Sequence, residues 1–170
     1  VGSSFSGWSG ACTGTGACTG TMDQARSVTS TFTLRTHAVG VTKSGTGTGT
    51  VTANAGSINC GATCSDLYNH GSSVVLTASA AVGSTFAGWS GACTGTGTCT
   101  VDVYGPATVE ANFALQSYPL TVSKLGAGSG TITSNPSGIQ CGSTCSEDFH
   151  HNTEITLSAV ASAGSDFTGW

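Results

Sequence analysis

One block of sequence occurs twice in this chain and begins a third time, and this repetition constrains the fold more than any other feature. Residues 83–99 read GSTFAGWSGACTGTGTC, residues 2–18 read GSSFSGWSGACTGTGAC, and residues 164–170 read GSDFTGW. Matching aromatic residues lie 81 positions apart each time: Trp8, Trp89, Trp170, Phe5, Phe86 and Phe167. A fixed period of this kind is the signature of tandem repeats. The sequence therefore predicts one small module copied head to tail.

The repeat also sets the expected domain boundaries. The overlapping copies align without a gap, and nearly half of the paired residues are identical. We expect a complete repeat at residues 37–117, the C-terminal part of a repeat at 1–36 and the N-terminal part of the next at 118–170, with residues 116–119 as the joint. A partial sheet leaves unpaired strand edges. We therefore expect this chain to be a piece of a longer array, or its halves to be completed by neighbouring molecules.

Composition and the spacing of apolar residues predict an all-β fold without significant helix. Only 7% of the residues are charged and 26 are glycines, which suits a chain with many turns. Apolar residues alternate in 28–34 and again in 109–115, the pattern of a strand with one buried face. Further short β-runs surround Val39, Val51 and Val74. Each repeat is expected to hold about five or six short strands.

A glycine-rich stretch joins two of these runs. Residues 45–49 read GTGTG and lead from the run around Val39 to the run around Val51. Two short β-runs joined in this way predict a hairpin. The stretch resembles a phosphate-binding loop only superficially, because no helical pattern follows it.

All eight cysteines belong to the repeat and predict a disulfide framework. Their even number and repeated spacing are typical of an oxidising compartment. We favour local pairs, each contributing on the order of 2 kcal/mol. These pairs are Cys12–Cys18, Cys60–Cys64, Cys93–Cys99 and Cys141–Cys145. Pairing between the two loops of one repeat, or between repeats, stays open. Zinc is disfavoured because only one pair in each repeat has the usual ligand spacing.

The tryptophan of the repeated block has two interpretations. Phe86 and Trp89 are three positions apart, so simple strand alternation would put them on opposite faces, whereas a bulge at Gly88 would turn both inward. The structural interpretation makes Trp89 a main core residue of a small module. The functional interpretation is an exposed ring that stacks on a sugar, with Trp89, Tyr68 or Phe149 as the platform.

Histidines and acids gather after the Cys-x3-Cys loop. His70 matches His151 in the next copy. A conceivable metal site there consists of Glu147, Asp148, His150 and His151. We favour a solvated loop instead, because His150 has no counterpart at Asn69, and we expect no metal and no cofactor.

One covalent hypothesis follows from recurring polar residues. Lysine, asparagine and an acid recur in both copies, as Lys43, Asn54 and Asp66 and as Lys124, Asn135 and Glu147. This combination would permit an isopeptide bond between lysine and asparagine, assisted by the acid. The simpler interpretation is a lysine that ends its strand in solvent.

Several classes of function have no support in the sequence. No Ser-His-Asp or Cys-His arrangement stands out, so we expect no enzyme activity. The formal net charge of −4 offers no basic patch for nucleic acid. No apolar run approaches the roughly 20 residues of a membrane span.

Five segments between residues 109 and 170 carry a family resemblance. They read VEANF (109–113), YPLTV (118–122), GTIT (130–133), TEITLSA (153–159) and GSDFTGW (164–170). Together with the motif Phe-x-Gly-Trp-Ser-Gly, they resemble the divergent InlB B-repeat domains of bacterial surface and secreted proteins. The resemblance implies a small β-rich module, similar to a β-grasp variant, strung in tandem outside the cell and without catalytic residues. The cysteines belong to a subset of such sequences, so the resemblance does not fix their pairing.

These observations favour a structural role. We expect a segment of an extracellular or cell-surface filament, stalk or adhesin whose partners are neighbouring repeats or identical chains, joined by strand addition. The alternative is a carbohydrate- or host-surface-binding module, and a third possibility is an appendage of an enzyme.

Overall fold

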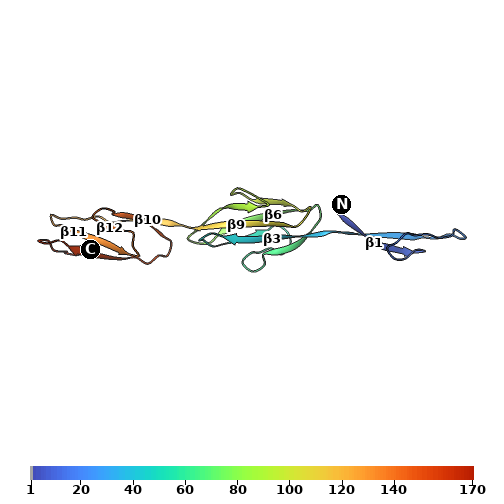
Figure 1. Ribbon diagram of the computed structural model, residues 1–170, viewed down its shortest axis with the longest axis horizontal. Helices are drawn as coiled ribbons and strands as arrows, with labels where there is room; N and C mark the ends of the chain where they lie inside the picture. The colour runs from blue at the N-terminus through green and yellow to red at the C-terminus, as the bar shows by residue number, and fades with distance from the viewer. Residues whose placement is uncertain (1) are drawn as a thin grey trace.

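The computed structural model describes residues 2–170, and within them it contains strands and no helix, as the sequence predicted. No helix that could span a membrane therefore occurs in these residues. Figure 1 shows three parts in a row along the long axis. We call them the N-terminal part (residues 2–34), the central module (residues 36–115) and the C-terminal part (residues 117–170).

The central module consists of two sheets. One sheet has the order β5-β3-β9-β7, from Ser65–Asn69, Thr36–Ser44, Ala107–Leu115 and Ser84–Gly91. The other has the order β4-β6-β8, from Gly49–Ala53, Ser73–Ala80 and Cys99–Asp102. The first and last strands of the module, β3 and β9, are parallel neighbours, with Val39 opposite Ala107. The other strand pairs of both sheets are antiparallel.

The core of the central module lies between the two sheets. Alternate residues of β3, β9, β4, β6 and β8 point into it, which is the period-2 burial expected of strands with one covered face. Its largest fully buried side chains are Phe113, Leu76, Val39, Val51, Val74, Val103 and Val109. Neither sheet has a covered face on its own, so the module depends on both.

The glycine-rich stretch does not form the predicted hairpin. It carries the chain from β3 in one sheet to β4 in the other, so that prediction was wrong. The backbone N–H of Gly47 donates to the carbonyl oxygen of Phe113 (N···O 2.8 Å). A Cβ added at Gly49 would overlap the ring of Phe113. Glycine is required because the backbone passes directly over this buried ring.

A bulge orients the two aromatic residues of the repeated block. The register between β7 and β9 shifts between Phe86 and Gly88, where Gly88 has a φ of 143°. Both aromatic side chains consequently face the core, with the Phe86 and Trp89 ring centroids 4.9 Å apart. The spacing of the two residues had pointed to such a bulge.

The two terminal parts repeat pieces of this architecture. In the N-terminal part, β1 (Ser3–Gly10) and β2 (Val28–Leu34) correspond to β7 and β9, with the same bulge between Phe5 and Gly7. In the C-terminal part the strands are β10 (Ser117–Thr121), β11 (Gly130–Asn135), β12 (Gln140–Cys141), β13 (Ser146–His150) and β14 (Thr156–Ala161). There β10 pairs with β13, and the second sheet has the order β12-β11-β14. The terminal parts thus represent complementary portions of one module.

Candidate functional site: the joints between modules

A single residue separates each part of the chain from the next. Strand β2 ends at Leu34 and β3 begins at Thr36, so Arg35 is the first linker. Strand β9 ends at Leu115 and β10 begins at Ser117, so Gln116 is the second. The chain therefore crosses each joint in an almost continuous extended strand, as Figure 1 shows.

Both backbone polar groups of each linker residue are hydrogen-bonded, one to each side of the joint. The N–H of Gln116 donates to the carbonyl oxygen of Gly83 in the central module, and its own carbonyl oxygen accepts from the N–H of His151 in the C-terminal part, both with N···O of 2.8 Å. At the first joint Arg35 has the same two bonds, to Gly2 and His70, again at 2.8 Å. Each matching residue lies 81 positions from its counterpart.

A histidine ring also packs on a glycine at each joint. A Cβ added at Gly83 would overlap the imidazole of His151, and one added at Gly2 would overlap that of His70. Gly83 has a φ of 76°, a conformation that L-residues rarely adopt. The sequence alone paired His70 with His151 but did not place these two glycines and two histidines at the joints. Their exact recurrence between the copies was the available signal.

The side chains around the two joints differ. At the first, Nε2 of His37 lies 3.1 Å from Nδ1 of His70, whose ring also meets Tyr104 edge-on at 5.5 Å between centroids. At the second, Tyr118 takes the place of His37, and its ring lies 6.2 Å from that of His151. The backbone bonds are thus the common feature, and the side chains around them vary.

Four disulfides close short loops inside the parts rather than linking one part to another. They join Cys12 to Cys18, Cys60 to Cys64, Cys93 to Cys99 and Cys141 to Cys145. The Cα–Cα distances are 5.7 Å and 5.6 Å in the seven-residue loops and 4.3 Å in both five-residue loops, so matching loops have the same span. These four bonds pair all eight cysteines of the chain.

A comparison with protein-family models matches three stretches of the chain, residues 1–42, 38–117 and 118–170, each to the divergent InlB B-repeat domain. The chain belongs to the divergent InlB B-repeat family. The matches together span its whole length, which agrees with the family resemblance of its motifs. The chain matched neither a curated protein nor a solved structure in the corresponding comparisons.

Two of the three aromatic rings proposed as a sugar platform, Trp89 and Tyr68, are buried in this B-repeat. Trp89 is only 5% exposed, and its Nε1–H donates to the carbonyl oxygen of Gly97 (2.6 Å). Tyr68 is 8% exposed, and its hydroxyl donates to the carbonyl oxygen of Ala55 (2.8 Å). Burial, followed by the charge of Asp66, raises the pKa of Tyr68. A platform at Trp89 or Tyr68 is therefore wrong, because both side chains belong to the core.

The third candidate ring and the acidic cluster lie on a strand, not in a solvated loop. Phe149 is half-buried and packs against the cluster around Val122. Its neighbours Glu147, Asp148 and His150 alternate along β13, so consecutive side chains point to opposite faces. Within residues 2–170, no three His, Cys, Asp or Glu side chains are placed to hold a metal ion. The loop part of that interpretation was wrong for Glu147, Asp148 and His150, which are exposed but lie on β13 paired with β10, whereas His151 lies in the turn that follows.

The residues of the isopeptide hypothesis each have a separate partner. Nζ of Lys43 donates to the carbonyl oxygen of Gly49 (3.0 Å), and Oδ1 of Asn54 accepts from the N–H of Val75 (2.9 Å). Lys124 repeats the lysine contact at Gly130, also at 3.0 Å. None of these bonds joins the lysine to the asparagine or to the acid. They hold the ends of the glycine-rich stretch and of β4 in place.

Asp66, the acid of that hypothesis, fastens a loop to β5. Its carboxylate accepts from the backbone N–H groups of Ser57 and Leu67 and from the Ser57 hydroxyl. These bonds, the Ser57 backbone bond first, lower the pKa of Asp66.

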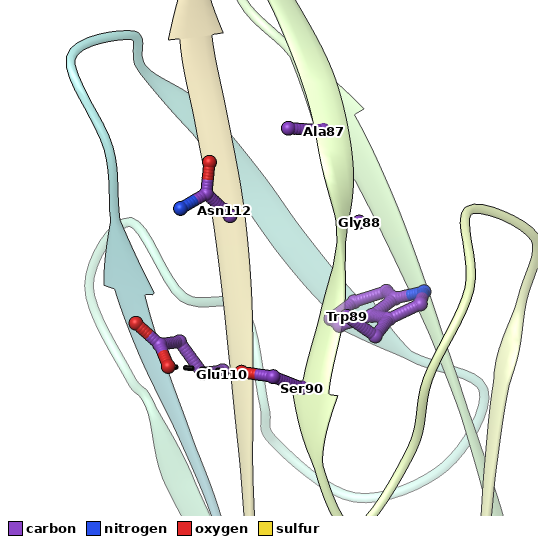
Figure 2. Close-up of a pocket in the computed structure, with 6 residues that line it drawn as sticks. All are labelled: Ala87, Gly88, Trp89, Ser90, Glu110 and Asn112. Carbon is purple, nitrogen blue, oxygen red and sulfur yellow. Dashed lines mark hydrogen bonds between the residues drawn. The ribbon is translucent and has the colours of Figure 1, made fainter.

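A shallow polar depression lies on the outer face of the four-stranded sheet (Figure 2). Ser90 donates to Glu110 there (2.9 Å), and hydrogen bonds from the Ser44 and Ser90 hydroxyls lower the pKa of that carboxyl. The indole of Trp89 points away from Glu110 and Asn112 in Figure 2, so no ring face completes the depression. In the N-terminal part threonines replace the acid and the amide, at positions 29 and 31. This depression is not a repeated feature, whereas the joint is.

Proposed function

We propose that this chain is a structural segment of a secreted or cell-surface protein, in which tandem modules set the length of a stiff filament, stalk or adhesin. The observation that carries the proposal is the repeated joint, with a one-residue linker bonded on both sides. Such a joint restricts bending, because any change of angle stretches at least one of two backbone hydrogen bonds. We further propose repeat boundaries at residues 36/37 and 117/118, close to the linkers Arg35 and Gln116.

Two other observations support the structural role. In a tandem array each module contacts mainly its neighbours, so length grows by adding copies. Four disulfides in a family of extracellular type suit an oxidising environment outside the cell. A glycan-binding role ranks second, because Trp89 and Tyr68 are buried and the polar depression occurs in only one copy.

A substitution at the second linker tests the proposal. Gln116→Pro removes the N–H that donates to Gly83 and leaves that carbonyl oxygen without its partner. Small-angle X-ray scattering of dilute protein should show a shorter mean dimension and a flexible profile for this variant. Gln116→Ala is the matched control, because it keeps both backbone bonds and should scatter like the parent chain.

Two outcomes would contradict the stiff-joint proposal. One is a flexible scattering profile for the parent chain itself. The other is identical profiles for the proline and alanine variants, which would mean that the bonds at the joint do not control its angle.

A further inference from the structure

We propose that His37 and His70, beside the first joint, form a binding site for a divalent transition-metal ion such as Zn²⁺. The two rings meet at one end of the central module, with Nε2 of His37 lying 3.1 Å from Nδ1 of His70. The proposal goes beyond the structural role, because metal binding needs only this pair and not a stiff joint. It would give the first joint a property that the second joint lacks.

Strand pairing brings the two histidines together. His37 lies on β3, and His70 directly follows β5, which pairs antiparallel with β3 so that His37 is opposite Tyr68. The backbone N–H of His70 donates to the carbonyl oxygen of Arg35 (N···O 2.8 Å), which continues the pairing by one residue beyond β5. Because side chains alternate along a strand, His70 projects from the same face as Tyr68. The two histidines are therefore diagonal neighbours on one face of the sheet, with ring centroids 5.3 Å apart.

The pair is held at the rim of the core. His37 lies on the face of β3 that contributes Val39 to the core, and both histidine side chains are half-buried. Tyr104, which follows β8 of the other sheet, meets the ring of His70 edge-on. Gly2 of the N-terminal part lies against the same ring. These contacts limit the movement of His70, so the facing nitrogens are positioned before an ion arrives.

The separation of the two nitrogens suits a shared metal ion. Imidazole nitrogens bind Zn²⁺ at about 2.0–2.1 Å, so nitrogens 3.1 Å apart subtend an angle of about 95–102° at an ion that both of them bind. This angle lies between the right angle of square-planar or octahedral sites and the wider angle of tetrahedral sites. An ion can therefore bind to the pair without a large movement of β3 or β5.

Both rings can present a lone pair to the ion. In a neutral imidazole one nitrogen carries a proton and the other a lone pair, and either nitrogen can carry the proton. The contact between His37 and His70 places one proton between the facing nitrogens. Movement of that proton to the far nitrogen of its own ring leaves two lone pairs directed at the space between the rings. Imidazole suits zinc, copper and nickel, whereas magnesium and calcium prefer oxygen ligands.

The pair describes a site that fills from solution. Structural zinc sites have four protein ligands, whereas two histidines leave the remaining positions of the ion to water. Residues 36–115 carry one lysine against three acids, a net charge of −2 (one positive minus three negative), so the module as a whole attracts a cation. The sequence offers no spacing motif for this site, because the two ligands are 33 positions apart.

The second joint provides a natural comparison. Tyr118 matches His37 and His151 matches His70, so a phenol takes the place of one imidazole. The two ring centroids there are 6.2 Å apart. Tyrosine is not among the usual ligands of zinc, which are cysteine, histidine and the carboxylates. We therefore expect an ion at the first joint and none at the second.

Isothermal titration calorimetry of the full chain with Zn²⁺ alone tests the inference. The parent chain should bind one ion. His37→Tyr gives the first joint the residue found at the second, and it should weaken binding by at least about 10-fold because it removes one of two ligands. His150→Ala is the matched control, because it also leaves three of the four histidines but spares the pair. This variant should bind Zn²⁺ like the parent.

Nuclear magnetic resonance of the parent chain supplies a second measurement that needs no variant. Addition of Zn²⁺ should shift the imidazole resonances of His37 and His70. The imidazole resonances of His150 and His151 should stay unchanged. The assignment thus stays testable if a variant folds poorly.

Several results would overturn the metal-site inference. They are absence of Zn²⁺ binding by the parent chain, equal affinity of the parent and His37→Tyr, weaker binding by His150→Ala, and imidazole shifts confined to His150 and His151. Each is separable from failure of the proposed function, because the scattering experiment measures stiffness without metal. A stiff chain that binds no Zn²⁺ would refute the metal site alone, and a flexible chain that binds it through the pair would refute the stiff joint alone.

Discussion

The central module and the C-terminal part contain matching strands, yet they differ in what those strands cover. Val51 is fully buried in β4, and its counterpart Ile132 is almost fully buried in β11. Each belongs to a cluster with the isoleucine and the first cysteine of its own Cys-x3-Cys loop region. By contrast, Leu76 is fully buried in β6, whereas Leu157 in β14 is only half-buried. Local strand pairing thus forms in both, while complete burial needs β7, β8 and β9. Apolar alternation specifies a strand, and only the second portion of the module gives that strand a core.

The largest expected effect comes from removing the ring that closes the core. Phe113→Ala should lower the free energy of unfolding of the central module by about 3–5 kcal/mol, because the ring is fully buried between the sheets. Phe32→Ala, the matching change in the N-terminal part, should lower it by less than about 0.5 kcal/mol in dilute monomer. Urea denaturation followed by circular dichroism measures both values. Equal losses would refute the stated contrast between the central module and the incomplete parts.

An intermediate effect is expected from the short disulfides. Replacing Cys60 and Cys64 together by alanine should lower the free energy of unfolding of the central module by about 2 kcal/mol, because the open loop gains entropy when unfolded. The matching change at Cys141 and Cys145 should leave the transition of the central module unchanged. Urea titrations of the two double variants make the comparison. A loss of stability in the central module from the second variant would show that the parts do not unfold independently.

The smallest effect concerns Asp66, whose position in the other copy is taken by Glu147. Its pKa is lower in the folded chain than in the unfolded chain, so its stabilising contribution is present above the ordinary carboxyl pKa and is lost as pH falls through the folded pKa. Asp66→Asn should therefore make stability less sensitive to pH in the acidic range. Ser57→Ala should have a smaller effect in the same direction, because the backbone bonds to Asp66 remain. Thermal denaturation between neutral and acidic pH tests this, and unchanged acid sensitivity in Asp66→Asn would contradict it.

The repeat and its alternation were sufficient to predict the all-β class and most of the core strands. Phe113 and Val109 could be assigned to a buried face because both copies keep an apolar residue at those positions. The hairpin prediction failed because two β-runs joined by glycines look alike whether they pair or diverge into separate sheets. The deciding contact, between the glycine-rich stretch and Phe113, joins residues far apart in the sequence.

Other features left weaker signals. Strands β5 and β8 are short, and β5 is rich in polar residues, so no apolar alternation marks it. The parallel pairing of β3 with β9 depends on the arrangement of the whole module and has no local signature. His70 and His151 were recognisable as recurring residues, but their place at a joint became evident only from the bonds that their backbones make to Arg35 and Gln116.

The parallel pairing of β3 with β9 has a mechanical consequence. Tension along an array enters the module through Arg35 at the start of β3 and leaves through Gln116 at the end of β9. Since the two strands run in the same direction along the paired stretch from Val39 to Ser44, this load slides one strand along the other and strains all their hydrogen bonds together. Rupture then requires those bonds to fail at once, not one after another as in a zipper. The module is therefore connected in a shear geometry, which resists being pulled apart from its ends.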